Sequence, residues 1–105
     1  MTPEGEIEAH LKKRVKETGG EVRKLKWIAR NGAPDRFVFW FPHLHIPVQL
    51  PIFAFVELKA PGKYATPQQE REHTRLKEAG FTVAVLDSKG LVDMFVETMT
   101  GSKLS

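Results

Sequence analysis

The run Ile52–Lys59 most constrains the fold of this chain, because it is rich in β-prone residues and alternates between two faces. A period of two places four aliphatic side chains on one face and two phenylalanines on the other, together with Glu57 and Lys59. The strand is apolar almost throughout, so a charged pair at its end stands out. The two charged residues at its end therefore share one face and call for an explanation.

The remaining segments alternate between helical and extended patterns. Apolar residues recur at helical spacing from residue 3 to 18, and Gly19-Gly20 ends that helix. A second helix, residues 68–79, begins after the cap Thr66 and Pro67. The further predicted elements are strands at 22–29, 35–41 and 81–86 and a helix at 90–99. The order αβββαβα predicts an α/β chain with one mixed (α+β) sheet flanked by helices.

The length of 105 residues predicts one domain, residues 1–105, with one modest core. The chain has no cysteine, which excludes disulfides, thiolate metal sites and a cysteine nucleophile and favours an intracellular protein. The N-terminus is acidic, unlike a signal peptide, and no apolar run approaches the ~20 residues of a membrane span. We therefore expect a cytoplasmic protein with no membrane partner.

The formal net charge of +3 lies entirely in the first third of the sequence. Residues 1–30 hold eight Lys and Arg against five Glu, whereas residues 31–105 hold eight of each sign. Such a stripe can contact phosphates, although a solvated helix and edge strand explain it as well. The candidate DNA contacts are Lys12, Lys13, Lys16, Lys24, Lys26, Arg30, Arg36, Lys63 and Tyr64. For the loop aromatic Tyr64, packing within the protein remains open.

Asp35 begins the second predicted strand and precedes Glu57 by 22 residues. If these strands pair as a hairpin, the two carboxylates meet at the same end of the sheet. With the Leu58 carbonyl they form an oxygen site suited to Mg²⁺ or Mn²⁺, which can activate water and stabilise charge on a phosphodiester. Lys59 can orient that water or stabilise the transition state. A turn-capping Asp35 and a Glu57–Lys59 ion pair are the alternative.

Carboxylates on the first predicted helix are further candidates. Steps of ~100° per residue place Glu4 inside the apolar stripe and Glu8 at its edge, so one or two acids face inward. The Pro-rich segment Phe41–Pro51 holds His43 and His45, which could form a metal pair, a dimer contact or a DNA-facing wedge, or have no function. His10 and His73 lie within predicted helices, and the pattern assigns them no role.

Pro34-Asp35 followed by Glu57-Leu58-Lys59 resembles the PD-(D/E)XK nuclease motif, and the αβββαβ order resembles the restriction-endonuclease-like core of those enzymes. More narrowly, residues 4–96 resemble the VRR-NUC family. The segments that carry this resemblance are Ile7-Glu8, Leu11–Lys16, Gly19-Gly20, Gly32–Arg36, Phe55–Gly62, Thr66–Gln69 and Leu76–Gly80.

The resemblance implies metal-dependent hydrolysis of phosphodiester bonds in branched DNA. Small stand-alone members are similar to homodimeric Holliday junction resolvases of phage or bacterial origin, so a phage-encoded chain would act in the cytoplasm of the bacterial host. A nicking or flap nuclease with looser substrate choice, and a DNA-binding accessory module without catalysis, are the alternatives.

The resemblance also implies roles for single residues. Asp35 and Glu57 hold the metal, Lys59 assists the nucleophile, and Gln69 matches the family's helix glutamine, which contacts metal-bound water or substrate. Related resolvases place a Glu on the first helix. Position within the stripe favours Glu4 there, whereas the family's Ile-Glu match favours Glu8.

Overall fold

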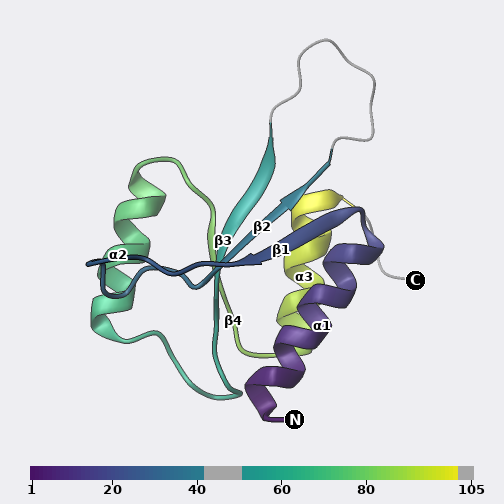
Figure 1. The fold of residues 1–105 in the computed structure, drawn as a ribbon, viewed down its shortest axis with the longest axis horizontal. Coiled ribbons are helices and arrows are strands. Elements are labelled where there is room, and N and C mark those ends of the chain that lie inside the picture. The colour runs from purple at the N-terminus through teal and green to yellow at the C-terminus, as the bar shows by residue number, and fades with distance from the viewer. Residues whose placement is uncertain (42–50, 102–105) are drawn as a thin grey trace.

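The computed structural model describes residues 1–41 and 51–101, which form one four-stranded sheet with helices on both faces (Figure 1). The elements, in chain order, are α1 (Pro3–Glu17), β1 (Gly20–Lys24), β2 (Arg36–Trp40), β3 (Ile52–Leu58), α2 (Pro67–Glu78), β4 (Val83–Leu86) and α3 (Lys89–Thr100). β1, β2 and β3 run antiparallel, and β4 joins β3 in parallel after the chain crosses over through α2. The predicted α/β fold with a mixed sheet is confirmed.

The hydrophobic core lies on the sheet face covered by α1 and α3, which Figure 1 shows side by side. Each element contributes the residues that its period places on this face. The buried core residues are Ile7, Leu11 and Val15 from α1, Val38, Trp40, Ala54, Val56, Leu58 and Leu86 from the sheet, and Val92, Phe95 and Val96 from α3. α2 lies on the opposite side of the sheet (Figure 1). No helix in the described ranges has the length and apolar character needed to cross a membrane.

β1 differs from its prediction, because it spans Gly20–Lys24 and not residues 22–29. Its ladder with β2 ends at the pair Lys24 and Arg36, followed by one hydrogen bond from the Leu25 amide to the Asp35 carbonyl (2.9 Å). Pro34 comes next on the partner strand and has no N–H, so the ladder cannot continue. The Trp27 indole donates instead to the Pro34 carbonyl (2.7 Å), outside any strand.

The other six elements lie within two residues of their predicted bounds at each end. Local signals explain this agreement, since side chains of Thr2, Thr66 and Ser88 cap the three helices as N-cap residues should. His43 and His45 fall in the range 42–50, outside the described residues, so their predicted roles remain predictions.

The turn before Asp35 is fixed against the start of α2. Gly32 has φ +83°, and a Cβ built on it would lie 2.8 Å from the Gln68 carbonyl oxygen. Nearby, the Arg30 guanidinium binds both carboxylate oxygens of Glu72 on α2, at 3.1 and 2.8 Å. Only glycine tolerates both this conformation and this approach, so the turn and the helix hold each other in place.

Replacing Gly32 with alanine should therefore destabilise the fold strongly. The left-handed conformation costs about 1–2 kcal/mol for a residue with a Cβ, and the steric conflict with α2 adds about 1–3 kcal/mol. Gly62→Ala is the matched control, because Gly62 has φ +77° but a Cβ added to it would meet nothing within 4 Å. Urea unfolding measures both variants, and equal losses of unfolding free energy would contradict the packing role of Gly32.

Candidate active site

Asp35 and Glu57 come together at one end of the sheet. The antiparallel register pairs Arg36 with Val56, so the next residues outward, Asp35 and Glu57, stand opposite each other. Residues opposite each other across two antiparallel strands lie on the same face, about 5 Å apart at their Cβ atoms. The expected hairpin geometry is therefore present.

Both carboxylates are short of hydrogen-bond partners. Glu57 is only 6% exposed, and neither its Oε1 atom nor the Oδ1 atom of Asp35 has a hydrogen-bond partner within the described part of the chain. A main-chain hydrogen bond from Leu58 reaches the Asp35 carboxylate. Buried carboxylate oxygens without donors are costly, which makes this place suited to a cation.

The electrostatics of the pair point the same way. Burial, reinforced by the negative charge of Asp35, raises the pKa of Glu57 to about 7, and the Lys59 ammonium opposes this rise. Burial likewise raises the pKa of Asp35, with Glu4 adding to the rise. Two acids that disfavour each other's charge would both be stabilised by a positive ion between them.

His73 lies beside this pair, although the sequence pattern assigned it no role. It projects from α2 toward the end of β3, is 4% exposed, and places its Nε2 atom 3.9 Å from Oε1 of Glu57. Burial lowers the pKa of His73, and the nearby Lys77 and Lys59 lower it further, so the ring is neutral near pH 7. Helical spacing was the available signal, because His73 follows Gln69 by four residues and shares its face.

Lys59 acts electrostatically on Glu57, whereas the described contacts of the Gln69 side chain lie at the start of α2. Lys59 alternates onto the face of Glu57 and is half-buried, as predicted from the strand period. The Gln69 side chain takes part in a capping box, in which its Oε1 accepts from the Thr66 amide (2.9 Å). Because the cap uses the amide oxygen, the NH₂ group is what Gln69 can offer to a substrate or to bound water.

One of the two helix acids is placed differently from the prediction, whereas Glu8 lies at the edge of the buried stripe as expected. Glu4 was expected inside the buried stripe, yet it is exposed, while Glu8 is half-buried and paired with Arg36. Glu4 lies in the first turn of α1, beyond the part of the helix that α3 covers (Figure 1). Its charge still acts on both Asp35 and Glu57, so it faces the mouth of the site.

Two of the predicted DNA contacts, both arginines, are held by acids, and Lys12 pairs with Glu8 at 3.5 Å while remaining exposed. Arg36 is 6% exposed and binds Glu8 and the Asp35 carboxylate, so it is not accessible to a phosphate. Arg30 uses two of its nitrogens to hold Glu72. The sequence pattern could not show these pairs, because Glu8 is 28 residues away from Arg36 and Glu72 is 42 residues away from Arg30. The remaining candidates are exposed: Lys12, Lys13, Lys16, Lys24, Lys26, Lys63 and Tyr64.

The donor set fits a hard divalent cation that keeps part of its water shell. In residues 1–41 and 51–101, no group of three or more His, Asp or Glu side chains is close enough to hold a metal by itself. Mg²⁺ is commonly bound through one or two carboxylates plus waters, and the orphaned oxygens of Asp35 and Glu57 supply two such ligands. The Leu58 main chain lies next to them at the end of β3.

Comparisons with known proteins identify the family of this chain. A family model described as the VRR-NUC domain matches residues 4–90. The chain belongs to the VRR-NUC family. A solved structure described as a "VRR_NUC domain" superimposes with a TM-score of 0.77 at 36% identity, covering 92% of this chain and 97% of that one.

A curated relative adds the activity. The chain is 44% identical over 88 residues to the "Putative nuclease p44" of Acyrthosiphon pisum secondary endosymbiont phage 1, a match that covers 84% of this chain and 86% of that protein. The VRR-NUC match spans the site completely, from Glu4 through the end of β4. The chain is therefore a VRR-NUC nuclease domain.

The raised pKa of Glu57 predicts how stability depends on pH in metal-free protein. The ordinary pKa of a glutamate is 4.5, and that of Glu57 in the folded protein is about 7. An acid with a raised folded-state pKa contributes its full stabilisation at a pH below 4.5, and this stabilisation is lost as the pH rises to about 7. The loss should reach about 3 kcal/mol of unfolding free energy. Glu57→Gln cannot ionise and should escape it.

Urea unfolding in EDTA between pH 4.5 and 8 measures the effect. Other titrating groups are shared by the two proteins, so the informative quantity is the difference between wild type and Glu57→Gln at each pH. A difference that stays constant across this window would contradict the assignment.

Proposed function

We propose that this VRR-NUC chain is a Mg²⁺- or Mn²⁺-dependent endonuclease that hydrolyses phosphodiester bonds in branched DNA, as a Holliday junction resolvase does. The observation that carries the proposal is the pair Asp35 and Glu57, which stand opposite each other at the end of the sheet and each hold one buried oxygen with no hydrogen-bond partner among the described residues. A DNA substrate of phage or bacterial origin places the working enzyme in the host cytoplasm.

The chain's residues divide the work as follows. Asp35 and Glu57 hold the ion, with the Leu58 carbonyl as a third oxygen ligand. When bound, Mg²⁺ or Mn²⁺ supplies activation of water and stabilisation of the charge that develops on the phosphate. Glu57 has to be ionised to act as a ligand. Lys59 donates to a phosphate oxygen or to the attacking water, and Gln69 donates through its NH₂ group.

Exposed lysines bring the DNA backbone to this site. Lys12, Lys13 and Lys16 lie on α1, Lys24 ends β1, and Lys26 follows it. Lys24 also acts electrostatically on Asp35, so the basic segment reaches the mouth of the site. Such contacts position the substrate without reading its sequence and weaken as salt concentration rises.

Removing either carboxylate or the lysine should abolish cleavage. Asp35→Asn, Glu57→Gln and Lys59→Ala should each reduce the cleavage rate at least ~100-fold, since each removes charge that binds the ion or stabilises the transition state. The assay uses an end-labelled four-way junction, a flap and a linear duplex, with Mg²⁺, Mn²⁺ or EDTA. EDTA should stop the reaction on every substrate.

Glu78→Gln is the control, because Glu78 is an exposed acid at the last residue of α2. Calorimetric titration with Mn²⁺ should give binding to wild type and to Glu78→Gln, but not to Asp35→Asn. Full activity of Asp35→Asn would overturn the proposal. Wild-type protein that binds DNA yet cuts none of the three substrates would indicate an accessory module, and equal rates on all three would indicate a less selective nuclease.

A second copy of this chain is part of the proposal. Aromatic side chains cover the side of the sheet opposite the core. We call this surface the aromatic face. Its residues are Trp27, Phe37, Phe39, Phe53, Phe55 and Phe81, and the centroids of neighbouring rings lie 5.5 to 6.1 Å apart. Trp27 and Phe81 are 37% and 38% exposed, and the adjoining Ile28 is 90% exposed. An apolar groove of about 570 Å³ runs along its Trp27 side.

The substrate explains why the partner should be a second copy. A four-way junction is resolved by two symmetric cuts, and one chain has one pair of catalytic carboxylates. A two-fold dimer places the same surface of each copy against the other and supplies the second site. Contiguous exposed aromatic surface is typical of such interfaces.

Ile28→Glu should therefore weaken dimerisation by at least about tenfold, because it buries a charge in the proposed interface. The matched control is Met94→Glu, an exposed apolar residue on α3, on the other side of the sheet. Sedimentation equilibrium gives the dimer dissociation constant, and junction assays score paired cuts. A monomeric wild-type protein, or equal effects of the two substitutions, would contradict the dimer.

A further inference from the structure

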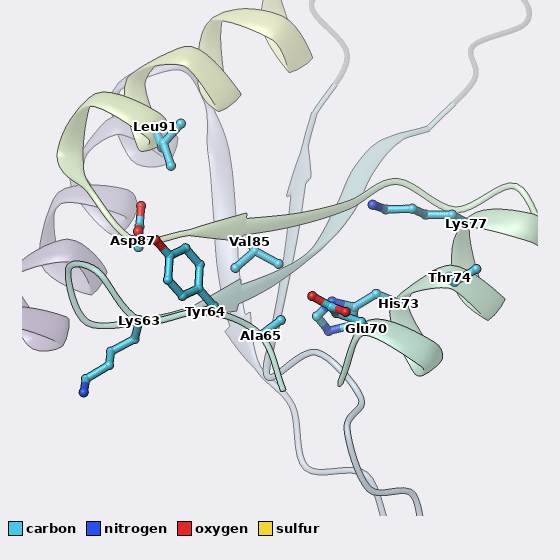
Figure 2. Close-up of a pocket in the computed structure, with 10 residues that line it drawn as sticks. All are labelled: Lys63, Tyr64, Ala65, Glu70, His73, Thr74, Lys77, Val85, Asp87 and Leu91. Atoms are coloured by element: carbon cyan, nitrogen blue, oxygen red, sulfur yellow. The ribbon is translucent and has the colours of Figure 1, made fainter. Parts of the chain in front are cut away.

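A cleft of about 490 Å³ lies next to the active site, and nothing described so far uses it. Figure 2 shows that four segments line it: the loop between β3 and α2, one side of α2, the end of β4 and the start of α3. Its volume falls within the ~300–1,000 Å³ of small-molecule sites. The residues that line it are Lys63, Tyr64, Ala65, Glu70, His73, Thr74, Lys77, Val85, Asp87 and Leu91.

Tyr64 is the most unusual of these residues. Its side chain is 83% exposed although it is a large aromatic ring, so packing within the chain does not explain it. In Figure 2 the ring stands in front of the end of β4, between Val85 and Asp87. An accessible ring over a partly apolar surface can stack on another flat ring.

The remaining lining residues combine apolar and polar groups. Val85 and Leu91 are 37% and 38% exposed and form apolar surface. Asp87 and Glu70 add acceptor oxygens, while Lys77 extends over the cleft in Figure 2. A phosphate alone would be repelled by the two acids, whereas a base accepts stacking from Tyr64 and donates its amino hydrogens to the carboxylates.

The cleft shares one residue with the catalytic pair. His73 lines it and also lies 3.9 Å from Glu57, measured from Nε2 to Oε1. A group in the cleft is therefore a neighbour of whatever phosphate Glu57 acts on. A strand whose scissile phosphate lies at Glu57 would therefore bring a neighbouring nucleotide toward the cleft.

We propose that this cleft binds one unpaired nucleotide next to the scissile phosphate, with its base stacked on Tyr64 and its phosphate near Lys77. The inference rests on the proposed nuclease function and deepens it. Bases inside a duplex are already stacked and cannot reach Tyr64, whereas a flap presents an unpaired base and a four-way junction presents one when a base pair at its crossover opens. The cleft thus gives the enzyme a direct means of preferring branched DNA.

Binding to the catalytically inactive Asp35→Asn protein tests the inference without requiring cleavage. Flap DNAs carry 2-aminopurine at one unpaired position next to the branch, four-way junctions carry it in a base pair at the crossover, and the label is moved along the strand in a series. Stacking on Tyr64 should change the fluorescence of 2-aminopurine at one position next to the branch and at none farther along the paired arms. Adding Tyr64→Ala should remove that change and weaken branched-DNA binding about tenfold.

Two matched controls make the result specific. Tyr64→Phe keeps the ring and should retain both the fluorescence change and the affinity. A linear duplex presents no unpaired base, so its affinity should be the same for Asp35→Asn alone and for Asp35→Asn combined with Tyr64→Ala or Tyr64→Phe. Lys77→Ala should lower the salt dependence of branched-DNA binding by about one counterion.

The outcomes separate the two levels of the proposal. If Tyr64→Ala binds branched DNA as tightly as its parent, or if Tyr64→Phe loses as much affinity as Tyr64→Ala, the stacking site is wrong. Those results leave cleavage by wild-type protein untouched. Wild-type protein that cleaves no DNA instead overturns the nuclease proposal, while a ring-dependent fluorescence change would still identify a nucleotide site.

Discussion

The placement of two like-charged carboxylates opposite each other at a buried sheet end is the constraint on which the rest of the structure depends. Glu57 is buried and Asp35 half-buried, and the pKa of each is raised there. Such an arrangement persists only if the surrounding structure fixes it. The Gly32 turn holds one strand end in place, and the Arg30–Glu72 pair ties that turn to α2. These contacts fix the position of Asp35 and so keep it opposite Glu57.

The two faces of the sheet have separate tasks as a result. Side chains alternate between the two faces of β2 and β3, so Val38, Ala54 and Val56 point toward α1 and α3 and form part of the core. The opposite face carries the acids at one end and the aromatic face over the rest. Because α2 lies near the acid end, that end is buried and the aromatic rings keep accessible surface. One strand period therefore generates the core, the site and the proposed interface.

Local patterns in the sequence were enough to predict the order of helices and strands along the chain and the meeting of Asp35 with Glu57, because both follow from residue periodicity and hairpin pairing. Features that depend on tertiary structure were not predictable in this way. The end of β1 depends on Pro34 of the partner strand. The proximity of His73 to Glu57 depends on how α2 docks, and the burial of Arg36 depends on Glu8 in a different element.

The two helix acids show how a periodicity argument reaches its limit. A helical-wheel projection treats every turn of α1 as equally covered by the rest of the protein. The first turn of α1 extends beyond α3 and is exposed, so Glu4 lies outside the core although its angle on the wheel predicts burial. Glu8 is closer to the core but already balances Arg36 and Lys12. Arg36 binds both Glu8 and Asp35, so Glu8 helps to hold this arginine beside the site. Glu4 forms none of the described ion pairs and acts electrostatically on both site carboxylates, so we propose Glu4 as the helix acid better suited to assist a bound metal.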